Sequence, residues 1–228
     1  MIVIKNRSAR NILGIVIPFV LIPATAFTGG LMFREKRHII FSLAVAVLAL
    51  LLFAAGFEKK STGTRRMVIC SVMTSMCFIG RFIPFLKPVT AITIITGIYL
   101  GGEAGFLVGA MSALLTNFYF GQGPWTAFQM LAWGLTGFFG GTFEKILQKN
   151  KVFLLIFGAL SGILYSMIMD IWTVLWYGEG FEIGLYLSAI TTAIPYTVSY
   201  AVSNVIFLWL LFKPFGQKLA RIKTKYGV

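Results

Sequence analysis

Long apolar runs separated by short polar breaks make up most of the chain. A helix needs about 20 apolar residues to cross the hydrocarbon core of a bilayer, and most of the runs approach that length. The run at 88–101 is shorter, so it must lean, be extended by its flanks or stay partly buried in protein. The pattern predicts an all-α integral membrane protein with helical segments at 11–32, 39–57, 67–84, 88–101, 103–120, 125–143, 152–177 and 184–212.

Composition supports this fold class. Hydrophobic residues make up 58% of the 228 residues and charged residues only 12%, which is more apolar surface than a soluble globule of this length can hide. The formal net charge of +13 does not indicate a nucleic-acid binder, because the basic residues stand in short clusters between the apolar runs. Such clusters are typical of span ends at an anionic membrane face.

These clusters also predict an orientation. The tail 214–228 and the loop 145–151 are basic, whereas the loop 178–182 contains glutamates and no base. By the positive-inside rule the tail and the basic loop are cytoplasmic, and the acidic loop is outside. Counting back along the spans places residues 121–124 and 81–87 outside, and 101–102 and the basic stretch 58–66 inside.

The first apolar run is harder to orient. It contains Pro18 and Pro23, and its small residues "ATA" at 24–26 resemble a signal-peptidase site. The basic stretch "REKRH" at 34–38 then falls on the outer side, where the positive-inside rule disfavours bases. Either this hairpin is only partly inserted, or the stronger basic clusters downstream override its charges.

Candidate catalytic chemistry is sparse. His38 is the only histidine, and the sequence has no P-loop, HExxH, CxxC or nucleophile-elbow motif. Clustered ligands for metal or phosphoryl chemistry are missing as well. We therefore expect no enzymatic activity, no metal site and no cofactor.

Asp170 is the only carboxylate deep inside a predicted span. Because a charge at the bilayer centre is expensive, functional use is the default interpretation of such a group. The alternative is a structural hydrogen bond to a neighbouring helix, through Asn204 or Thr191. Aromatic side chains follow one to two turns later and either face a ligand or form an interfacial belt: Trp172, Trp176 and Tyr177.

Polar residues also gather on the predicted outer side. Arg81 and Lys87 flank the stretch "FIPFL", and the loop "NFYFGQGPWTAFQM" at 117–130 carries amides and rings but no charge. The topology places them in one layer with the aromatic end of the span 152–177. We expect an outward pocket with apolar walls and a few polar anchors, which is usual for a small-molecule site. The alternative is that Arg81 and Lys87 only reach toward lipid headgroups.

Small side chains share one face of the predicted helix at 67–80, and such faces let helices approach closely. We expect this face to dock on another helix through Cys70, Ser71, Thr74 and Ser75. Glycine pairs of similar spacing are expected to serve internal packing: Gly105 with Gly109, and Gly158 with Gly162.

Three elements, "KPV", "GGEAGFLVGA" and "NFYFGQGPWTAFQM", fall within residues 65–141. This region closely resembles the substrate-binding S components of energy-coupling factor (ECF) transporters, particularly the branch with cobalamin-binding members. A looser resemblance reaches the C-terminus, and "PFVLIPAT" in the first run is similar to an N-terminal extension of this branch. The docking helix departs from the family pattern, because Ser71 and Ser75 stand where an AxxxA motif is usual.

The resemblance implies a six-helix core at 65–213. It implies that the core is preceded by a two-helix extension with a cytoplasmic linker at 1–64 and followed by a basic cytoplasmic tail at 214–228. Such a subunit captures a vitamin outside the cell and is not an enzyme. A transmembrane coupling subunit and two ATPases then drive uptake, with the S component toppling in the membrane to present its cargo inside.

For the substrate site, the resemblance places the loop 117–130 over the outward pocket, with Asn117 and Gln122 as hydrogen-bonding anchors. Phe118, Phe120 and Trp125 are expected as its walls. The expected cargo is cobalamin. A bulky corrinoid needs a wide pocket, and a pocket lined by many aromatic rings suits it better than a charge-specific site would. Since His38 lies outside the core, we expect no protein–cobalt bond, and cobalamin would be transported substrate. The candidate substrate-binding residues are Arg81, Lys87, Asn117, Phe118, Phe120, Gln122, Trp125, Gln129, Asp170, Trp172, Trp176 and Tyr177.

Three alternatives stay open. The cargo would be another micronutrient, such as a deazapurine precursor of queuosine. A stand-alone carrier would couple transport to protons through Asp170. A membrane scaffold would bind a partner through Ser71 and Ser75 and bind no ligand.

Overall fold

The structure is a computed structural model that describes residues 7–32, 38–55, 60–178 and 180–226. Most of the basic stretch "REKRH" therefore lies outside the described residues. The described chain is all helical apart from connecting turns, as predicted. Its helices are α1 (Arg7–Val16), the π-helical η1 (Ile17–Leu21), α2 (Ile22–Met32), α3 (His38–Ala55), α4 (Lys60–Gly80), α5 (Val89–Leu100), α6 (Gly102–Phe120), α7 (Trp125–Thr142), α8 (Glu144–Lys149), α9 (Lys151–Tyr177) and α10 (Ile183–Tyr226).

Each predicted segment overlaps one helix or, at the N-terminus, the continuous series α1, η1 and α2. The bounds differ most at 67–84, where α4 begins and ends earlier, and at 184–212, where α10 continues to Tyr226. Pro18 lies in η1, where its missing amide hydrogen interrupts the regular α-helical ladder. The short helix α8 was not predicted, because "EKILQK" is brief and largely polar. Within the described residues, three helical stretches are long and apolar enough to cross a membrane, which supports a multi-pass membrane protein: Ser8–Gly29, Lys151–Tyr177 and Ile183–Tyr226.

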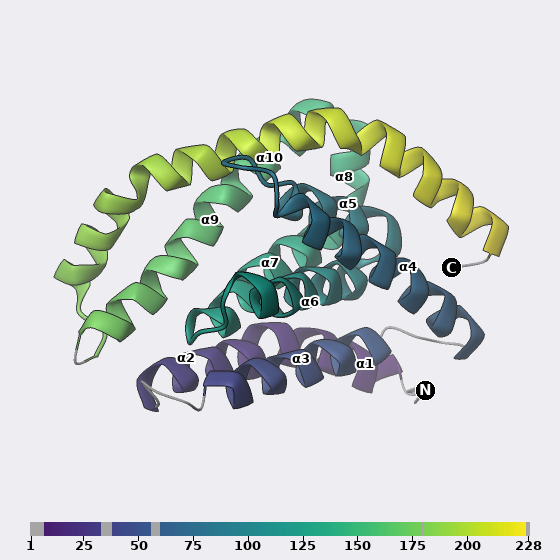
Figure 1. Ribbon diagram of the computed structural model, residues 1–228. Helices are drawn as coiled ribbons and strands as arrows, with labels where there is room; N and C mark the ends of the chain where they lie inside the picture. Colours follow the sequence, from purple (N-terminus) through teal and green to yellow (C-terminus); the bar gives the residue numbers. More distant parts are fainter. Residues whose placement is uncertain (1–6, 33–37, 56–59, 179, 227–228) are drawn as a thin grey trace.

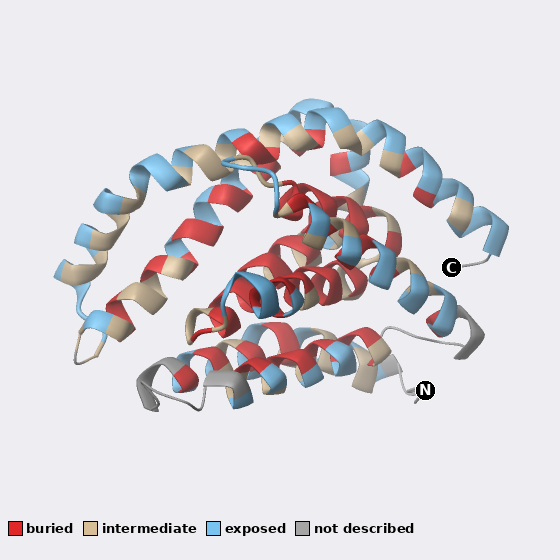
Figure 2. Ribbon diagram, viewed as in Figure 1, coloured by how far each residue is buried: buried red, intermediate tan, exposed pale blue. Residues whose placement is uncertain are grey.

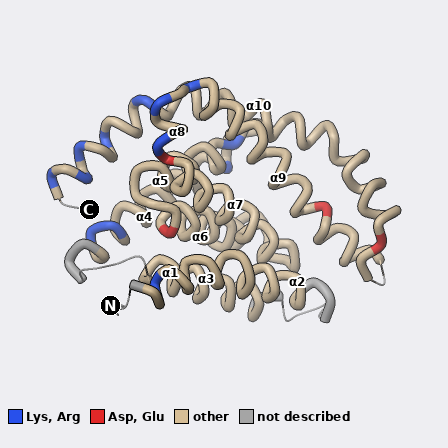
Figure 3. The backbone as a smooth tube through the Cα atoms, turned by 180° about the vertical axis from the view of Figure 1, so that it is seen from behind, with Lys and Arg blue, Asp and Glu red and all other residues tan. Residues whose placement is uncertain are grey.

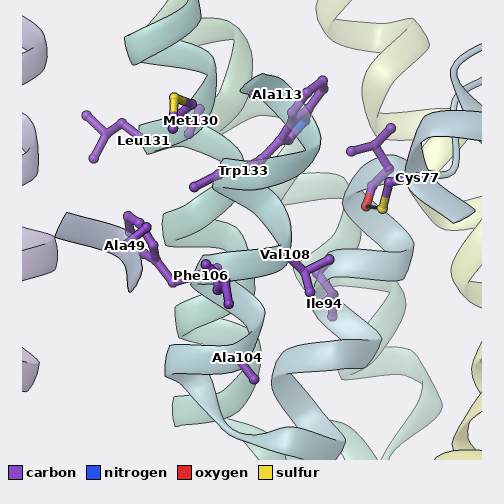
Figure 4. Close-up of a cluster of buried hydrophobic side chains, with 14 of the residues drawn as sticks. Ala49, Cys77, Ile94, Ala104, Phe106, Val108, Ala113, Met130, Leu131 and Trp133 are labelled. Atoms are coloured by element: carbon purple, nitrogen blue, oxygen red, sulfur yellow. Dashed lines mark hydrogen bonds between the residues drawn. The ribbon is translucent and has the colours of Figure 1, made fainter. Parts of the chain in front are cut away.

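The helices pack around a centre formed by α5, α6 and α7 (Figure 1). The N-terminal helices α1–α3 cover one side of this centre, whereas α9 and α10 pair with each other and pass over the other side. Buried residues are concentrated in the central helices, and α10 is exposed along most of its length (Figure 2). The apolar core includes Ala49, Cys77, Ile94, Phe106 and Met130 from α3 to α7 (Figure 4).

The short helix α5 stays inside the protein. All but one of its residues are buried, and it packs against α6, α7 and α10. Thr93 and Thr96 satisfy their hydroxyls within the helix by donating to the carbonyls of Val89 and Ile92, at 2.7 and 2.8 Å. Of the possibilities that the sequence allowed for this run, burial in protein is therefore the one observed.

Glycines allow the closest helix contacts. A Cβ at Gly109 would collide with the backbone of Trp133, and one at Gly162 would collide with the backbone of Ala201. At Gly158 the obstacle is the side chain of Leu208. The prediction that these glycine spacings serve internal packing is confirmed.

Basic residues gather at one end of the described chain. The last helix, α10, runs through Pro195 and Pro214 to Tyr226, so the basic tail forms its final turns. Arg65 at the start of α4 donates to the Tyr226 carbonyl at 2.6 Å. In Figure 3 the basic positions of early α4, α8 and late α10 lie in the same half of the molecule. Segments that the positive-inside rule assigned to one side of the membrane are thus close in space.

Candidate functional site

A chain of hydrogen bonds joins the loop after α4 to three helices. Arg81, the first residue of that loop, donates to the side chains of Thr116 and Asn117 near the end of α6, with 2.8 Å to Asn117 Oδ1. The Asn117 amide donates to Gln129 Oε1 on α7 at 2.8 Å. Gln129 Nε2 then donates to the Tyr165 hydroxyl on α9 at 3.0 Å. Three of the predicted site residues, Arg81, Asn117 and Gln129, are therefore in one buried network.

Aromatic rings enclose this network. Trp133 stacks on Tyr165, with ring centroids 5.2 Å apart and an interplanar angle of 18°. Tyr200 of α10 meets Tyr165 edge-to-face at 5.0 Å. The Arg81 guanidinium lies 5.5 Å from the centre of the Trp133 ring and 4.9 Å from that of Phe120. A planar cation and these four rings thus form one side of the site.

A cavity of about 70 Å³ lies against these groups, between α5, α7, α9, α10 and the loop after α4. Lys87 is fixed at its edge, because its backbone amide donates to Ser203 Oγ at 2.9 Å and its carbonyl accepts from the same hydroxyl at 3.1 Å. Burial, and the charge of nearby Arg81, lower the pKa of the Lys87 ammonium. The lining residues are Arg81, Lys87, Val89, Thr90, Gln129, Trp133, Tyr165, Tyr200 and Asn204.

The glutamine of the "GQGP" loop serves the loop itself. Gln122 Nε2 donates to the Leu114 carbonyl at 3.0 Å, and its Oε1 accepts from Thr126 at 2.9 Å. Gly121 has φ 109°, a conformation that favours glycine. A Cβ at Gly123 would collide with the Trp125 ring. Gln122 therefore holds the connection between α6 and α7 in place and is not among the cavity-lining residues.

A second aromatic group bridges α7 and α9. Trp125 meets Trp172 edge-to-face at 5.6 Å, and Trp172 stacks on Trp176 at 6.2 Å. The indole nitrogen of Trp172 is buried without a hydrogen-bond partner in the described part of the chain. Tyr177 is 75% exposed at the end of α9. The three tryptophans thus form a continuous seam between α7 and α9, and Tyr177 stands outside it.

The two phenylalanines expected as walls have different surroundings. Phe120 packs against Arg81 and Phe82, with ring centroids 5.1 Å apart for the aromatic pair. Phe118 is 65% exposed and lines a different hollow, a groove of about 690 Å³ between α4 and α6. The groove also contains every small residue of the predicted docking face, and its lining is Leu50, Met67, Cys70, Ser71, Thr74, Ser75, Phe78, Ile79, Leu107, Met111, Leu115 and Phe118.

Asp170 is 7% exposed on α9 and does not line the small cavity. Neither of the two side chains considered as its hydrogen-bond partners bonds to it. Asn204 donates to the Gly158 carbonyl at 3.0 Å, and Thr191 donates to the Leu187 carbonyl at 2.8 Å. Within the described residues, the Asp170 carboxylate has no hydrogen bond or ion pair.

Several lining residues were absent from the sequence-based set. Trp133 follows Gln129 by four residues, so helical periodicity on α7 was a usable signal for it. Tyr165, Tyr200 and Asn204 carried no such signal, because they come from helices whose pairing with α5 and α7 is set by tertiary packing.

A family model described as "ECF-type riboflavin transporter, S component" matches residues 61–221. The match spans α4 to most of α10 and leaves the N-terminal helices α1–α3 outside. No curated protein and no solved structure matches the chain.

Proposed function

The chain belongs to the family of ECF-type riboflavin transporter S components, and from this premise we propose that it captures a vitamin at the outer side of a bacterial cell membrane. A coupling subunit and two ATPases would complete the importer and drive uptake. The protein itself would be a binding subunit and not an enzyme.

The observation that carries this proposal is the buried network from Arg81 through Asn117 and Gln129 to Tyr165, which lies against a cavity. Buried polar side chains are costly unless they are hydrogen-bonded, and a few placed against aromatic walls are usual in ligand sites. A ligand in the cavity would contact the network through Arg81, Gln129 and Tyr165, and it would therefore join the loop after α4 to α7 and α9.

The cargo that we favour is riboflavin. The family description names it, and the Trp133 and Tyr165 rings, which stack on each other, offer aromatic surface to a flat ring whose edges accept and donate hydrogen bonds. Cobalamin, expected from the sequence, is the second candidate. The seam of Trp125, Trp172 and Trp176 favours it, because this seam offers a bulky ligand additional apolar surface.

Binding of either vitamin requires the site to open. Ligand pockets for molecules of this size have volumes of about 300–1,000 Å³, well above the cavity of about 70 Å³. We propose that α9 moves away from α7 by parting Trp125 from Trp172. The basic end of the molecule would face the cytoplasm, with the C-terminus inside, and the groove between α4 and α6 would receive the coupling subunit.

The test is a calorimetric titration of the purified full chain in detergent with riboflavin, cobalamin and a deazapurine in turn. Trp133→Leu should weaken binding of the true cargo at least tenfold, whereas Trp209→Leu on the exposed face of α10 should not. Tight binding of cobalamin instead of riboflavin would identify cobalamin as the cargo. Folded protein that binds none of the three would overturn the proposed function.

A further inference from the structure

Another hollow lies among the basic segments of the molecule. It has a volume of about 320 Å³ and is enclosed by α5, α8, the start of α9 and α10. Three lysines and no acidic side chain are among its described lining residues, which are Tyr99, Leu147, Gln148, Lys149, Lys151, Trp209, Phe212, Lys213 and Gln217. This volume is within the usual range for small-molecule sites.

The wall from α5 and α10 is closely packed. The rings of Tyr99 and Phe212 lie 5.9 Å apart. A Cβ at Gly216 would collide with the Tyr99 hydroxyl, so α10 approaches α5 at this glycine. The apolar floor of the hollow is therefore held by the same contact that joins the two helices.

The opposite wall fixes the lysine-bearing backbone. Gln148 Nε2 donates to the Ile98 carbonyl at 3.3 Å, which ties α8 to α5. Asn150 caps α9 by accepting from two amides in its first turn, at 2.9 and 3.3 Å. Lys149 and Lys151 flank this cap, so both cations project from an ordered junction.

The surroundings of the hollow are amphipathic. The Lys151 ammonium lies 5.0 Å from the centre of the Trp209 ring, and Trp209 is itself 57% exposed. Exposed apolar side chains follow both residues in the sequence. Val152 and Phe153 follow Lys151 on α9, and Leu210 follows Trp209 on α10. A ligand that combines a phosphate with apolar chains matches this arrangement better than a soluble anion does.

We propose that this hollow binds the headgroup phosphate of an anionic phospholipid, whose acyl chains lie on the apolar surfaces of α9 and α10. Lys149, Lys151 and Lys213 supply the positive charge, and Trp209 lies at the boundary between headgroup and chains. The site involves neither the vitamin cavity nor the groove between α4 and α6, so it does not depend on the proposed cargo.

The test uses the purified full chain and its retention of phosphatidylglycerol over phosphatidylcholine in native mass spectrometry, with thermal stabilisation by each lipid as a second readout. The pocket variant is K149Q/K151Q/K213Q. The matched control, K218Q/R221Q/K223Q, removes the same charge from exposed positions of α10 outside the hollow. Each lysine near an anionic headgroup contributes about fivefold in affinity, so the pocket variant should lose on the order of 100-fold.

Preserved selectivity in the control variant and its loss in the pocket variant would support the site. Equal losses in both variants would overturn it, since binding would then follow net charge alone. An added arm titrates inorganic phosphate into lipid-free protein. Saturable stabilisation by phosphate, abolished in the pocket variant and not exceeded by phosphatidylglycerol, would also overturn the lipid assignment and indicate a soluble anion.

Discussion

The indole rings of Trp125 on α7 and Trp172 on α9 meet edge-to-face with their centroids 5.6 Å apart. This contact closes the seam between the two helices that hold Gln129 and Tyr165, the polar end of the cavity. An edge-to-face pair contributes about 1 kcal/mol beyond the area that it buries. Such a contact is strong enough to hold the seam shut and weak enough to open on binding.

The first prediction concerns this seam. Trp172→Ala should raise the dissociation rate of the bound vitamin about tenfold, because it removes the contact to Trp125 and its buried area. The rate would be measured by stopped-flow fluorescence, in which an excess of unlabelled vitamin displaces bound fluorescent vitamin. Trp176→Ala is the control, since Trp176 stacks on Trp172 of its own helix and not on Trp125 of α7, and it should change the rate much less. Equal rates in both variants and the parent would contradict a closing role for the seam.

A second prediction separates the hydrogen-bonded tyrosine from its neighbour. Tyr165→Phe removes the hydroxyl that accepts from Gln129 at 3.0 Å but keeps the ring stacked on Trp133. It should cost about 1–2 kcal/mol in vitamin binding, because the Gln129 amide is left unpaired in a buried site. Tyr200→Phe preserves the ring contact to Tyr165 and should have a smaller effect. Calorimetry of the two variants side by side would compare their losses of binding free energy. A larger loss in Tyr200→Phe would show that the important polar contact to the vitamin comes from α10.

The apolar pattern predicted the helices well because helix-length runs in a membrane protein have few alternatives. It also predicted that the run at 88–101 was too short for an ordinary span, and α5 is buried in protein. The site was predicted less completely. Arg81, Asn117 and Gln129 stood out as polar residues in an apolar chain, and the structure brings them together.

What escaped prediction was the contribution of other helices. Tyr200 reaches the site only because α10 packs across α5 beside α9, a relationship that no local spacing encodes. Phe118 is the converse case. It is two residues before Phe120 on α6, and about 200° of helical rotation directs it to the α4–α6 groove. The sequence alone does not show that these two phenylalanines lie on opposite faces of α6.

A third prediction concerns stability. Gly137→Ala places a Cβ against the backbone of Gly105, at one of the close contacts between α6 and α7. Overpacking of this kind should lower the free energy of unfolding by about 1–3 kcal/mol, measured as a lower midpoint of thermal unfolding in detergent. Gly14→Ala is the matched control, because Gly14 is helical and a Cβ added there would stand in open space. It should leave the midpoint unchanged or raise it. A neutral Gly137→Ala would mean that the helices can separate at low cost.

A fourth prediction distinguishes the importer from a proton-coupled carrier. Asp170→Asn keeps the shape of the side chain and removes its ability to carry a proton. In cells that contain the coupling subunit and ATPases, uptake should stay within about threefold of the parent, because Asp170 does not line the cavity. Parent protein in cells without the ATPases should give no uptake. Uptake that survives loss of the ATPases but not Asp170→Asn would establish the carrier instead.

The last prediction concerns the groove between α4 and α6. Ser71 and Ser75 are exposed there, and each hydroxyl is satisfied within its own helix by a carbonyl four residues earlier, at 3.0 and 2.9 Å. The helix therefore does not need these hydroxyls for contacts to the rest of the chain, and their small size is what leaves the groove open. Ser71→Leu/Ser75→Leu should obstruct it and reduce co-purification of the coupling subunit at least tenfold, since close helix approach depends on small side chains.

Ser188→Leu is the matched control for this experiment, because Ser188 on α10 is also exposed and also bonds a carbonyl four residues earlier, at 3.0 Å. It should leave the complex intact. Vitamin binding to the isolated chain should be unchanged in all three proteins, since the groove and the cavity share no lining residue. Loss of the complex in the groove variant with intact vitamin binding would separate docking from capture. Equal co-purification from all three proteins would place the coupling subunit on another face.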